Sequence, residues 1–240
     1  MSFSPLKMVI MDMDGTAVQY EGSSFHSSWD AIGIASGKGE EWLKAGEQYY
    51  RNIRECEKKG EPEQAKQLYI QWFDLNCQML EGTEVENLKT QIFPPPYTPG
   101  FPEFCAYLEK AGILRGIVSS GVDLVADRIK EELNLEFAVA NKLHLLEGKF
   151  SGSGEMDVPL WKKGELVAKV MQAYGVNSGE VAYIGDHEND VGAWEKVAWK
   201  LGMNLKRPEL FFHVDEHFHD FHEVKEWLKS KFNGNTKSFK

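Results

Sequence analysis

A short apolar run at residues 8–11 is followed by two aspartates, Asp12 and Asp14, and then by Gly15 and Thr16. An apolar run of this length that stops at glycine is typical of a buried strand. Alternate residues of a strand point to the same side, so the two carboxylates converge at its carboxyl end, where open α/β sheets bind ligands. The pair needs a cation, or a proton held by one member, because like charges repel. Either condition suits phosphoryl transfer, which uses a metal-bound nucleophile beside an acid or base. The alternative is structural, because Asp-x-Asp also occurs in turns and helix caps at strand ends.

Three later segments carry polar residues at comparable places. Residues 113–121 read as a second strand that ends in hydroxyl side chains and a glycine. Lys162, Lys163 and Gly164 open a helical segment. Residues 181–190 read as a third strand that ends in the pattern Gly-Asp-x-x-x-Asp.

In this order, the four segments resemble motifs I to IV of the haloacid dehalogenase superfamily, and the match covers about two thirds of the chain. The long helical insert after the first motif resembles the phosphoserine-phosphatase-like branch. The resemblance implies an α/β fold, in which a Rossmann-like parallel sheet is covered by helices on both faces and an α-helical cap domain is inserted.

The organisation of the chain agrees with an inserted cap. Between residues 40 and 88, apolar residues recur at near-helical spacing, and Gly60-Glu61-Pro62 divides them into two helices. Consecutive prolines at 94–96 mark the return linker. Helix and strand patterns then alternate as in a parallel sheet, with a short hairpin near residues 143–151. We therefore assign residues 1–16 and 93–240 to the core and 17–92 to the cap.

Composition limits the partners and the compartment. The formal net charge of -10 argues against nucleic-acid binding, which needs a basic face. Three widely spaced cysteines fit no disulfide or zinc pattern, which favours a reducing cytoplasm. The sequence has no signal-like N-terminal region and no apolar run of membrane-spanning length, so we expect no membrane partner. We also expect a monomer or homodimer.

The resemblance implies roles for the first two acidic residues. Asp12 is the candidate nucleophile, which would form an aspartyl-phosphate. Asp14 is the candidate general acid for the leaving alcohol and then the base for water, a role that needs a raised pKa. An aspartate at this second position accompanies phosphatases and phosphomutases in the superfamily.

The second and third motifs supply contacts to the phosphoryl group. Ser119 would donate to a phosphoryl oxygen, helped by backbone N–H groups near Ser120 and Gly121, although a serine here is also a common helix N-cap. Lys163 would neutralise charge on Asp12 and its phosphoryl group. Lys162 is the competitor, but Lys-Gly is the pattern of the resembled family.

The resemblance also implies a Mg²⁺ site. Mg²⁺ prefers oxygen ligands, which the side chains of Asp12 and Asp186 and the backbone carbonyl of Asp14 would provide. Asp190 completes the acidic set and would support the site from behind the direct ligands. The alternative is a structural role, because the helix dipole favours an acidic residue in the first turn of a helix.

The substrate is less defined than the reaction. Glu21 matches the acidic residue that phosphoserine phosphatases place after motif I, but Asn76 stands where they carry an arginine for the substrate carboxylate. Asparagine cannot provide the charged, bidentate guanidinium group of an arginine. Arg51 or Arg54 would have to bind the substrate carboxylate instead.

We therefore expect a Mg²⁺-dependent phosphomonoester hydrolase for a small metabolite, either a phosphoserine-like compound or a sugar or polyol phosphate. The alternatives are a phosphoryl transferase that uses the same intermediate and a non-catalytic binding protein on this scaffold.

Overall fold

The computed structural model describes residues 6–20 and 27–232. The chain divides into two compact units, which we name the core unit and the helical unit. The core unit comprises Met1–Tyr20, Pro95–Ala140 and Asp157–Lys240, and the helical unit comprises Glu21–Pro94 and Asn141–Met156.

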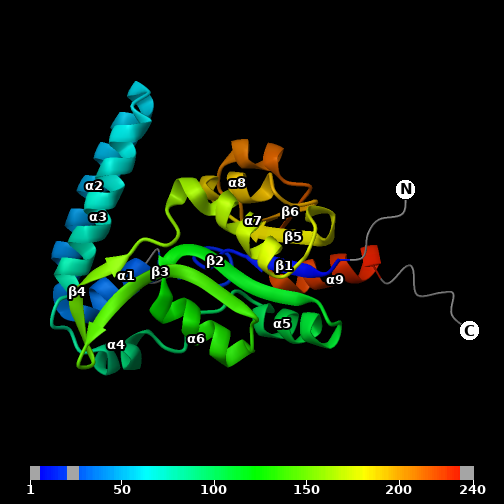
Figure 1. Cartoon of the computed structure of the whole chain (residues 1–240), viewed down its shortest axis with the longest axis horizontal. Helices are drawn as coiled ribbons and strands as arrows, with labels where there is room; N and C mark the ends of the chain where they lie inside the picture. Colours follow the sequence, from blue (N-terminus) through cyan, green and yellow to red (C-terminus); the bar gives the residue numbers. More distant parts are fainter. Residues whose placement is uncertain (1–5, 21–26, 233–240) are drawn as a thin grey trace, which may run out of the picture. The chain divides into compact units, whose positions relative to one another are not determined.

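A mostly parallel sheet organises the fold (Figure 1). The strands are β1 (Met8–Met11), β2 (Leu114–Val122), β3 (Phe137–Leu146), β4 (Lys149–Glu155), β5 (Val181–Gly185), β6 (Trp199–Met203) and β7 (Glu216–Phe218). In the part of the chain that the structure describes, they follow the order β4-β3-β2-β1-β5-β6-β7. Strand β1 pairs in parallel with β2 and β5, and β6 pairs in parallel with β5 and β7, whereas β3 and β4 are antiparallel. The predicted α/β class is confirmed.

Helices cover both faces of the sheet in the core unit. They are α5 (Phe101–Lys110), α6 (Asp123–Leu133), α7 (Lys163–Ala173), α8 (Val191–Trp194) and α9 (Phe221–Phe232). Helix α7 packs on α8, and α5 packs on α6 and α9; Figure 1 shows these two groups on opposite sides of the sheet. All four β1 residues are buried, as expected for a central strand covered on both faces.

The helical unit contains α1 (Ser28–Gly33), α2 (Gly39–Lys59), α3 (Pro62–Leu80) and α4 (Val85–Ile92). The predicted break is confirmed, since α2 ends before Gly60 and α3 begins at Pro62, where a missing N–H is harmless. Trp29 packs edge-on against Trp72 and Phe73, with ring centroids 5.5 and 5.6 Å apart. Among the described helices, none combines the length and apolarity that crossing a membrane requires.

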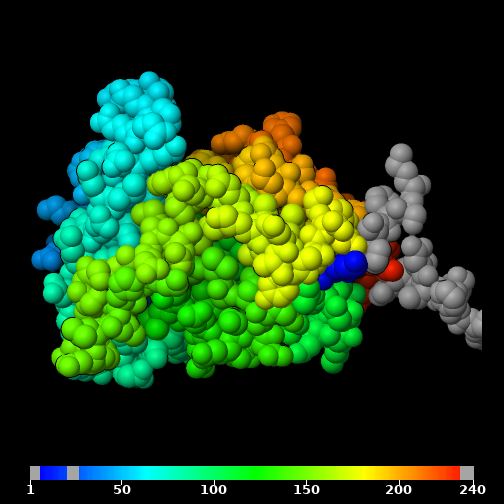
Figure 2. Space-filling model, in the orientation of Figure 1, coloured from blue at the N-terminus to red at the C-terminus, as the bar shows by residue number. Residues whose placement is uncertain are grey.

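One segment differs from the sequence-based assignment. The sequence-based assignment places residues 141–156 in the core, whereas these residues, which form β4 and the part of β3 after Ala140, group with the helical unit. Backbone hydrogen bonds explain this placement, because Gly82 N–H donates to the Phe150 carbonyl at 2.9 Å and Phe150 N–H donates to the Thr83 carbonyl at 3.1 Å. In the space-filling view, the yellow-green hairpin and the cyan helices of this unit form a continuous surface (Figure 2). A hairpin pattern is local, so it did not indicate where the hairpin docks.

The close packing of β2 against β3 gives a test of the fold. A Cβ atom added at Gly116, which pairs with Ile10 of β1, would lie 2.5 Å from ring atoms of Phe137. Gly116→Ala should therefore lower the free energy of unfolding by about 1–3 kcal/mol in urea titrations, as overpacking does. Gly179→Ala is the matched control, because a Cβ atom there meets open space. Equal stability of the two variants would contradict the packing described for β2.

Candidate active site

Asp12 lies at the carboxyl end of the central strand. The Asp12 N–H donates to the Ile184 carbonyl of β5 at 2.9 Å, which continues the parallel pairing beyond β1. Asp12 is only 4 % exposed, and its Oδ1 accepts from the Met13 N–H at 2.8 Å. The neighbouring strand therefore fixes both the position and the orientation of this carboxylate.

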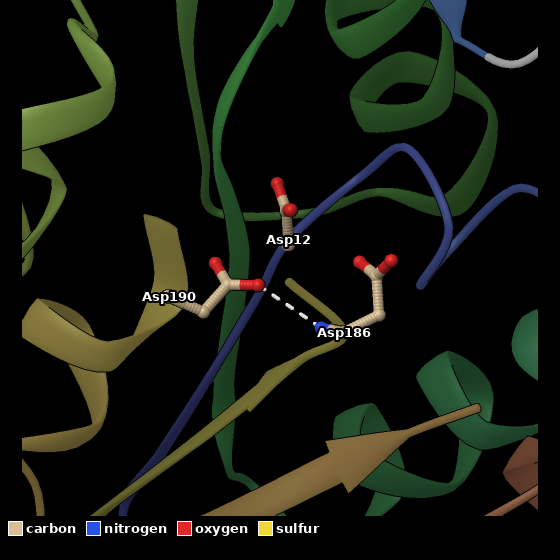
Figure 3. Close-up of side chains that lie close together, drawn as sticks. All are labelled: Asp12, Asp186 and Asp190. Carbon is tan, nitrogen blue, oxygen red and sulfur yellow. Dashed lines mark hydrogen bonds between the residues drawn. The ribbon is translucent and has the colours of Figure 1, made fainter. Parts of the chain in front are cut away.

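The fourth predicted motif brings two further carboxylates to the same place. Asp186 follows β5 directly, and Asp190 closes the short 3₁₀ turn Glu188–Asp190. Oxygen atoms of Asp12, Asp186 and Asp190 lie within 4.8 Å of one another. Figure 3 shows Asp12 on the segment after β1 and the other two on the segment after β5, with the Asp190 carboxylate facing the Asp186 nitrogen.

A buried ammonium group joins this carboxylate cluster. Lys163, the first residue of α7, is 1 % exposed, whereas Lys162 is exposed. The Lys163 Nζ lies 3.0 Å from Asp12 Oδ2 and 2.7 Å from Asp190 Oδ1. Burial alone would lower the Lys163 pKa, but the charges of Asp12 and Asp190 outweigh it and raise the pKa above its ordinary value. The ammonium therefore stays charged and pairs with two carboxylates, which lie on the segments that follow two different strands.

Asp190 is held by four donors. Its Oδ1 accepts from the Lys163 ammonium and from the Tyr183 hydroxyl, each at 2.7 Å. Its Oδ2 accepts the backbone N–H groups of Asp186 and His187, each at 3.0 Å. Because two carboxylate oxygens offer about four acceptor positions, little capacity is left for a direct metal bond. This arrangement favours a supporting role for Asp190.

The loop after β1 packs against Asp186. Gly15 has a φ angle of 82°, and a Cβ atom added there would lie 2.2 Å from Asp186 Oδ2, so only glycine fits. The Thr16 hydroxyl donates to Asp186 Oδ1 at 3.0 Å. Asp14 lies between these residues and Asp12 and is partly exposed, and among the described residues its side chain is outside the carboxylate cluster.

The predicted phosphate-contact residues lie at the end of β2. Ser119 and Ser120 are 2 % and 8 % exposed, and the Ser119 hydroxyl accepts the Gly121 N–H at 3.2 Å. Ser119 is close enough to Asp12 to lower the pKa of that carboxyl. The alternative reading of Ser119 as a helix N-cap is wrong, because β2 continues to Val122, which itself precedes α6. Glu21 lies outside the described residues.

The environment of the cluster opposes ionisation of Asp12 and Asp186. Burial raises the pKa of Asp12 above its ordinary value, although Lys163 acts in the opposite direction. Burial also raises the pKa of Asp186 well above its ordinary value, and the charges of Asp12 and Asp190 add to this effect. Both shifts favour the protonated carboxyl, and added positive charge would oppose that preference.

The donor set fits a hard divalent cation. Asp186 Oδ2 accepts no hydrogen bond from the described residues, and it belongs to a cluster made entirely of oxygen donors. Such donors suit Mg²⁺ rather than metals that prefer nitrogen or sulfur. Asp12 and Asp186 are therefore the residues best placed to hold a cation.

The sequence did not point to two contributors, nor to one further buried polar group beside the site. Thr16 and Tyr183 fix Asp186 and Asp190 through their hydroxyl groups. Asn189 has a buried side-chain oxygen with no hydrogen-bond partner in the described part of the chain. Two features of the sequence could have indicated these residues. One is a polar side chain inside a motif, and the other is a tyrosine in a strand of otherwise small or aliphatic residues.

With this geometry in place, comparison with known proteins defines the class. A family model of haloacid dehalogenase-like hydrolases matches residues 6–197. The chain belongs to this family, and the resemblance inferred from the four motifs is confirmed.

Individual relatives point to one group within the family. The chain is 27 % identical to the phosphoserine phosphatase of Methanocaldococcus jannaschii over 201 residues, which cover 83 % of this chain and 86 % of the relative. It is 26 % identical to the phosphoserine phosphatase of Archaeoglobus fulgidus but spans only 53 % of that protein. A solved structure described as a phospho-aspartyl intermediate analogue of phosphoserine phosphatase superposes with a TM-score of 0.70 and 25 % identity, covering 93 % of this chain and 99 % of the other.

Repulsion in the cluster predicts an unusual pH dependence for the metal-free protein. A raised carboxyl pKa in the folded state means that the folded state binds more protons than the unfolded state above about pH 4. The contribution of the cluster to stability should therefore fall as pH rises from 4. Asp186→Asn should weaken this fall and raise Tm at pH 7, because Oδ1 of asparagine can still accept from Thr16.

The measurement is thermal unfolding in EDTA between pH 4 and 8. Asp215→Asn is the control, because Asp215 is exposed and, among the described residues, its side chain accepts only the backbone N–H of Lys200. If Asp186→Asn and wild type showed the same pH slope, the proposed repulsion would not limit stability.

Proposed function

We propose that the protein is a Mg²⁺-dependent phosphomonoester hydrolase that acts on a small phosphorylated metabolite through an aspartyl-phosphate. The observation that carries this proposal is the position of Asp12, a strand-end carboxylate 3.0 Å from a buried ammonium and within the carboxylate cluster. A purely structural aspartate would not need two further carboxylates beside it, since they raise the cost of keeping it ionised.

The first half of the reaction uses Asp12 and Asp14. An oxygen of Asp12 attacks the phosphorus atom while the bond from phosphorus to the ester oxygen breaks. Asp14 gives its proton to the departing alkoxide, which leaves as an alcohol. Asp14 is suited to reach the leaving group because it is partly exposed, whereas Asp12 is buried.

The second half regenerates the enzyme. Asp14 takes a proton from water, whose oxygen attacks the phosphorus of the aspartyl-phosphate, and the bond to Asp12 breaks to release phosphate. Lys163 compensates negative charge on Asp12 throughout, and Ser119, with the backbone near Ser120 and Gly121, binds phosphoryl oxygens.

Asp12, Asp186 and the carbonyl of Asp14 would hold Mg²⁺, and Asp190 would orient its neighbours. When bound, the cation screens the repulsion between the attacking carboxylate and the phosphoryl group.

Phosphoserine is the first substrate to test, because the relatives reported above are phosphoserine phosphatases. The helical unit gives a reason to test others. Asn76 is fully buried, and neither atom of its amide has a hydrogen-bond partner among the described residues. Arg51 pairs with Glu47, and Arg54 lies over the Tyr50 ring, so both engage neighbours on their own helix. A sugar or polyol phosphate therefore remains in the proposal.

Replacement of the nucleophile tests the reaction. Asp12→Asn should reduce phosphate release by at least roughly a thousandfold, because a neutral amide cannot form the phosphoenzyme. The assay uses phosphoserine, sugar phosphates, nucleotides and p-nitrophenyl phosphate with Mg²⁺, and Asp215→Asn serves as a matched control. Retention of most of the activity would rule out Asp12 as the nucleophile. A new phosphoester formed with excess glycerol would favour the transferase alternative.

Metal dependence has a readout that does not require turnover. EDTA should abolish activity and Mg²⁺ should restore it, and saturating Mg²⁺ should also raise Tm. At a concentration 100 times the Kd, a ligand adds about 2.7 kcal/mol to the stability of the folded state. Asp186→Asn should lose this thermal shift. A shift of unchanged size in that variant would place the cation elsewhere.

A further inference from the structure

Tyr183 is a buried tyrosine in a strand of otherwise small or aliphatic residues. It lies in β5, its side chain is fully buried, and its hydroxyl donates to Asp190 Oδ1 at 2.7 Å. Burial, together with the neighbouring negative charges, raises the Tyr183 pKa well above its ordinary value. The hydroxyl is therefore always a donor.

The oxygen that Tyr183 contacts also receives Lys163. The Lys163 ammonium lies 2.7 Å from Asp190 Oδ1 and 3.0 Å from Asp12 Oδ2, so two carboxylates share one cation. Tyr183, Lys163 and Asp190 are each at most 1 % exposed. Water is thus poorly placed to satisfy either carboxylate, and protein donors decide how the ammonium is shared.

We propose that Tyr183 is a positioning residue, whose hydroxyl occupies part of Asp190 Oδ1 and so leaves the Lys163 ammonium available to Asp12. This inference rests on the proposed function, because the group that it serves is the candidate nucleophile. Nothing in the four motifs calls for a tyrosine at this position.

The Tyr183 hydroxyl limits how strongly Asp190 attracts the Lys163 ammonium. With the hydroxyl present, Asp190 has four donors, and its charge is spread over all of them. Without the Tyr183 hydroxyl, one acceptor position of Asp190 Oδ1 has no donor in a site that is closed to water. The remaining donors then bind Asp190 more tightly. Lys163 then moves toward Asp190 and away from Asp12. Charge on the phosphorylated Asp12 is compensated less well.

Tyr183→Phe tests the proposal because it removes only the hydroxyl and keeps the ring. We expect kcat to fall about tenfold, in line with the loss of a hydrogen bond to a charged group. KM should change less than twofold, because the interaction matters after the substrate is bound. A merely structural hydroxyl would lower Tm without changing kcat well below the unfolding temperature.

Two comparisons isolate the route through Asp190. Tyr174→Phe is the control, since Tyr174 is exposed and its hydroxyl donates to the Glu136 carbonyl outside the cluster. In an Asp190→Asn background, Tyr183→Phe should have less than a twofold effect on kcat, because the carboxylate charge through which it acts is absent. A crystal structure of metal-free Tyr183→Phe should show Lys163 Nζ farther than 3.0 Å from Asp12 Oδ2.

The outcomes separate this inference from the proposed function. Absence of phosphate release by the wild-type protein on every substrate would defeat the proposed function. If the wild type is active, the inference is overturned by a Tyr183→Phe kcat within twofold of wild type, by a tenfold fall that persists in the Asp190→Asn background, or by an unchanged Lys163–Asp12 distance.

Discussion

The buried ammonium of Lys163 is the interaction on which the rest of the site depends. It joins Asp12, which follows β1, to Asp190, which follows β5, and it comes from a third element, α7. An ammonium that is 1 % exposed is tolerated only where its charge is paired and its hydrogen bonds are made. Removing one partner of such a pair is costly, so the two strand ends and the helix start are held in a fixed relation.

Parallel pairing explains why these groups meet at all. Strand β1 has β2 on one side and β5 on the other, so their carboxyl ends lie along one edge of the sheet. Ser119, Asp12 and Asp186 therefore come together although more than sixty residues separate each from the next. The glycine at position 15 then allows the loop after β1 to approach Asp186 closely.

Parallel strand pairing also explains which site residues could be predicted from the sequence. Asp12 and Asp186 were found because an apolar strand that ends in a carboxylate is visible in the sequence, and Lys163 was chosen over Lys162 by resemblance. Tyr183 and Thr16 were not found, because a hydroxyl's partner depends on which strands lie side by side. The β3–β4 hairpin could be recognised from the sequence, but the unit with which it groups could not, because its backbone hydrogen bonds with Gly82 and Thr83 are tertiary contacts.

Charge balance within the site gives the final constraint. When ionised, the three clustered carboxylates exceed the single Lys163 ammonium by two negative charges. Asp190 is satisfied by its four donors, so the excess is concentrated on Asp12 and Asp186, whose pKa values are both raised. A divalent cation between these two would cancel the excess and would lower both pKa values, whereas a monovalent cation would cancel half of it. The charge balance of the cluster thus suits a divalent cation better than a monovalent one.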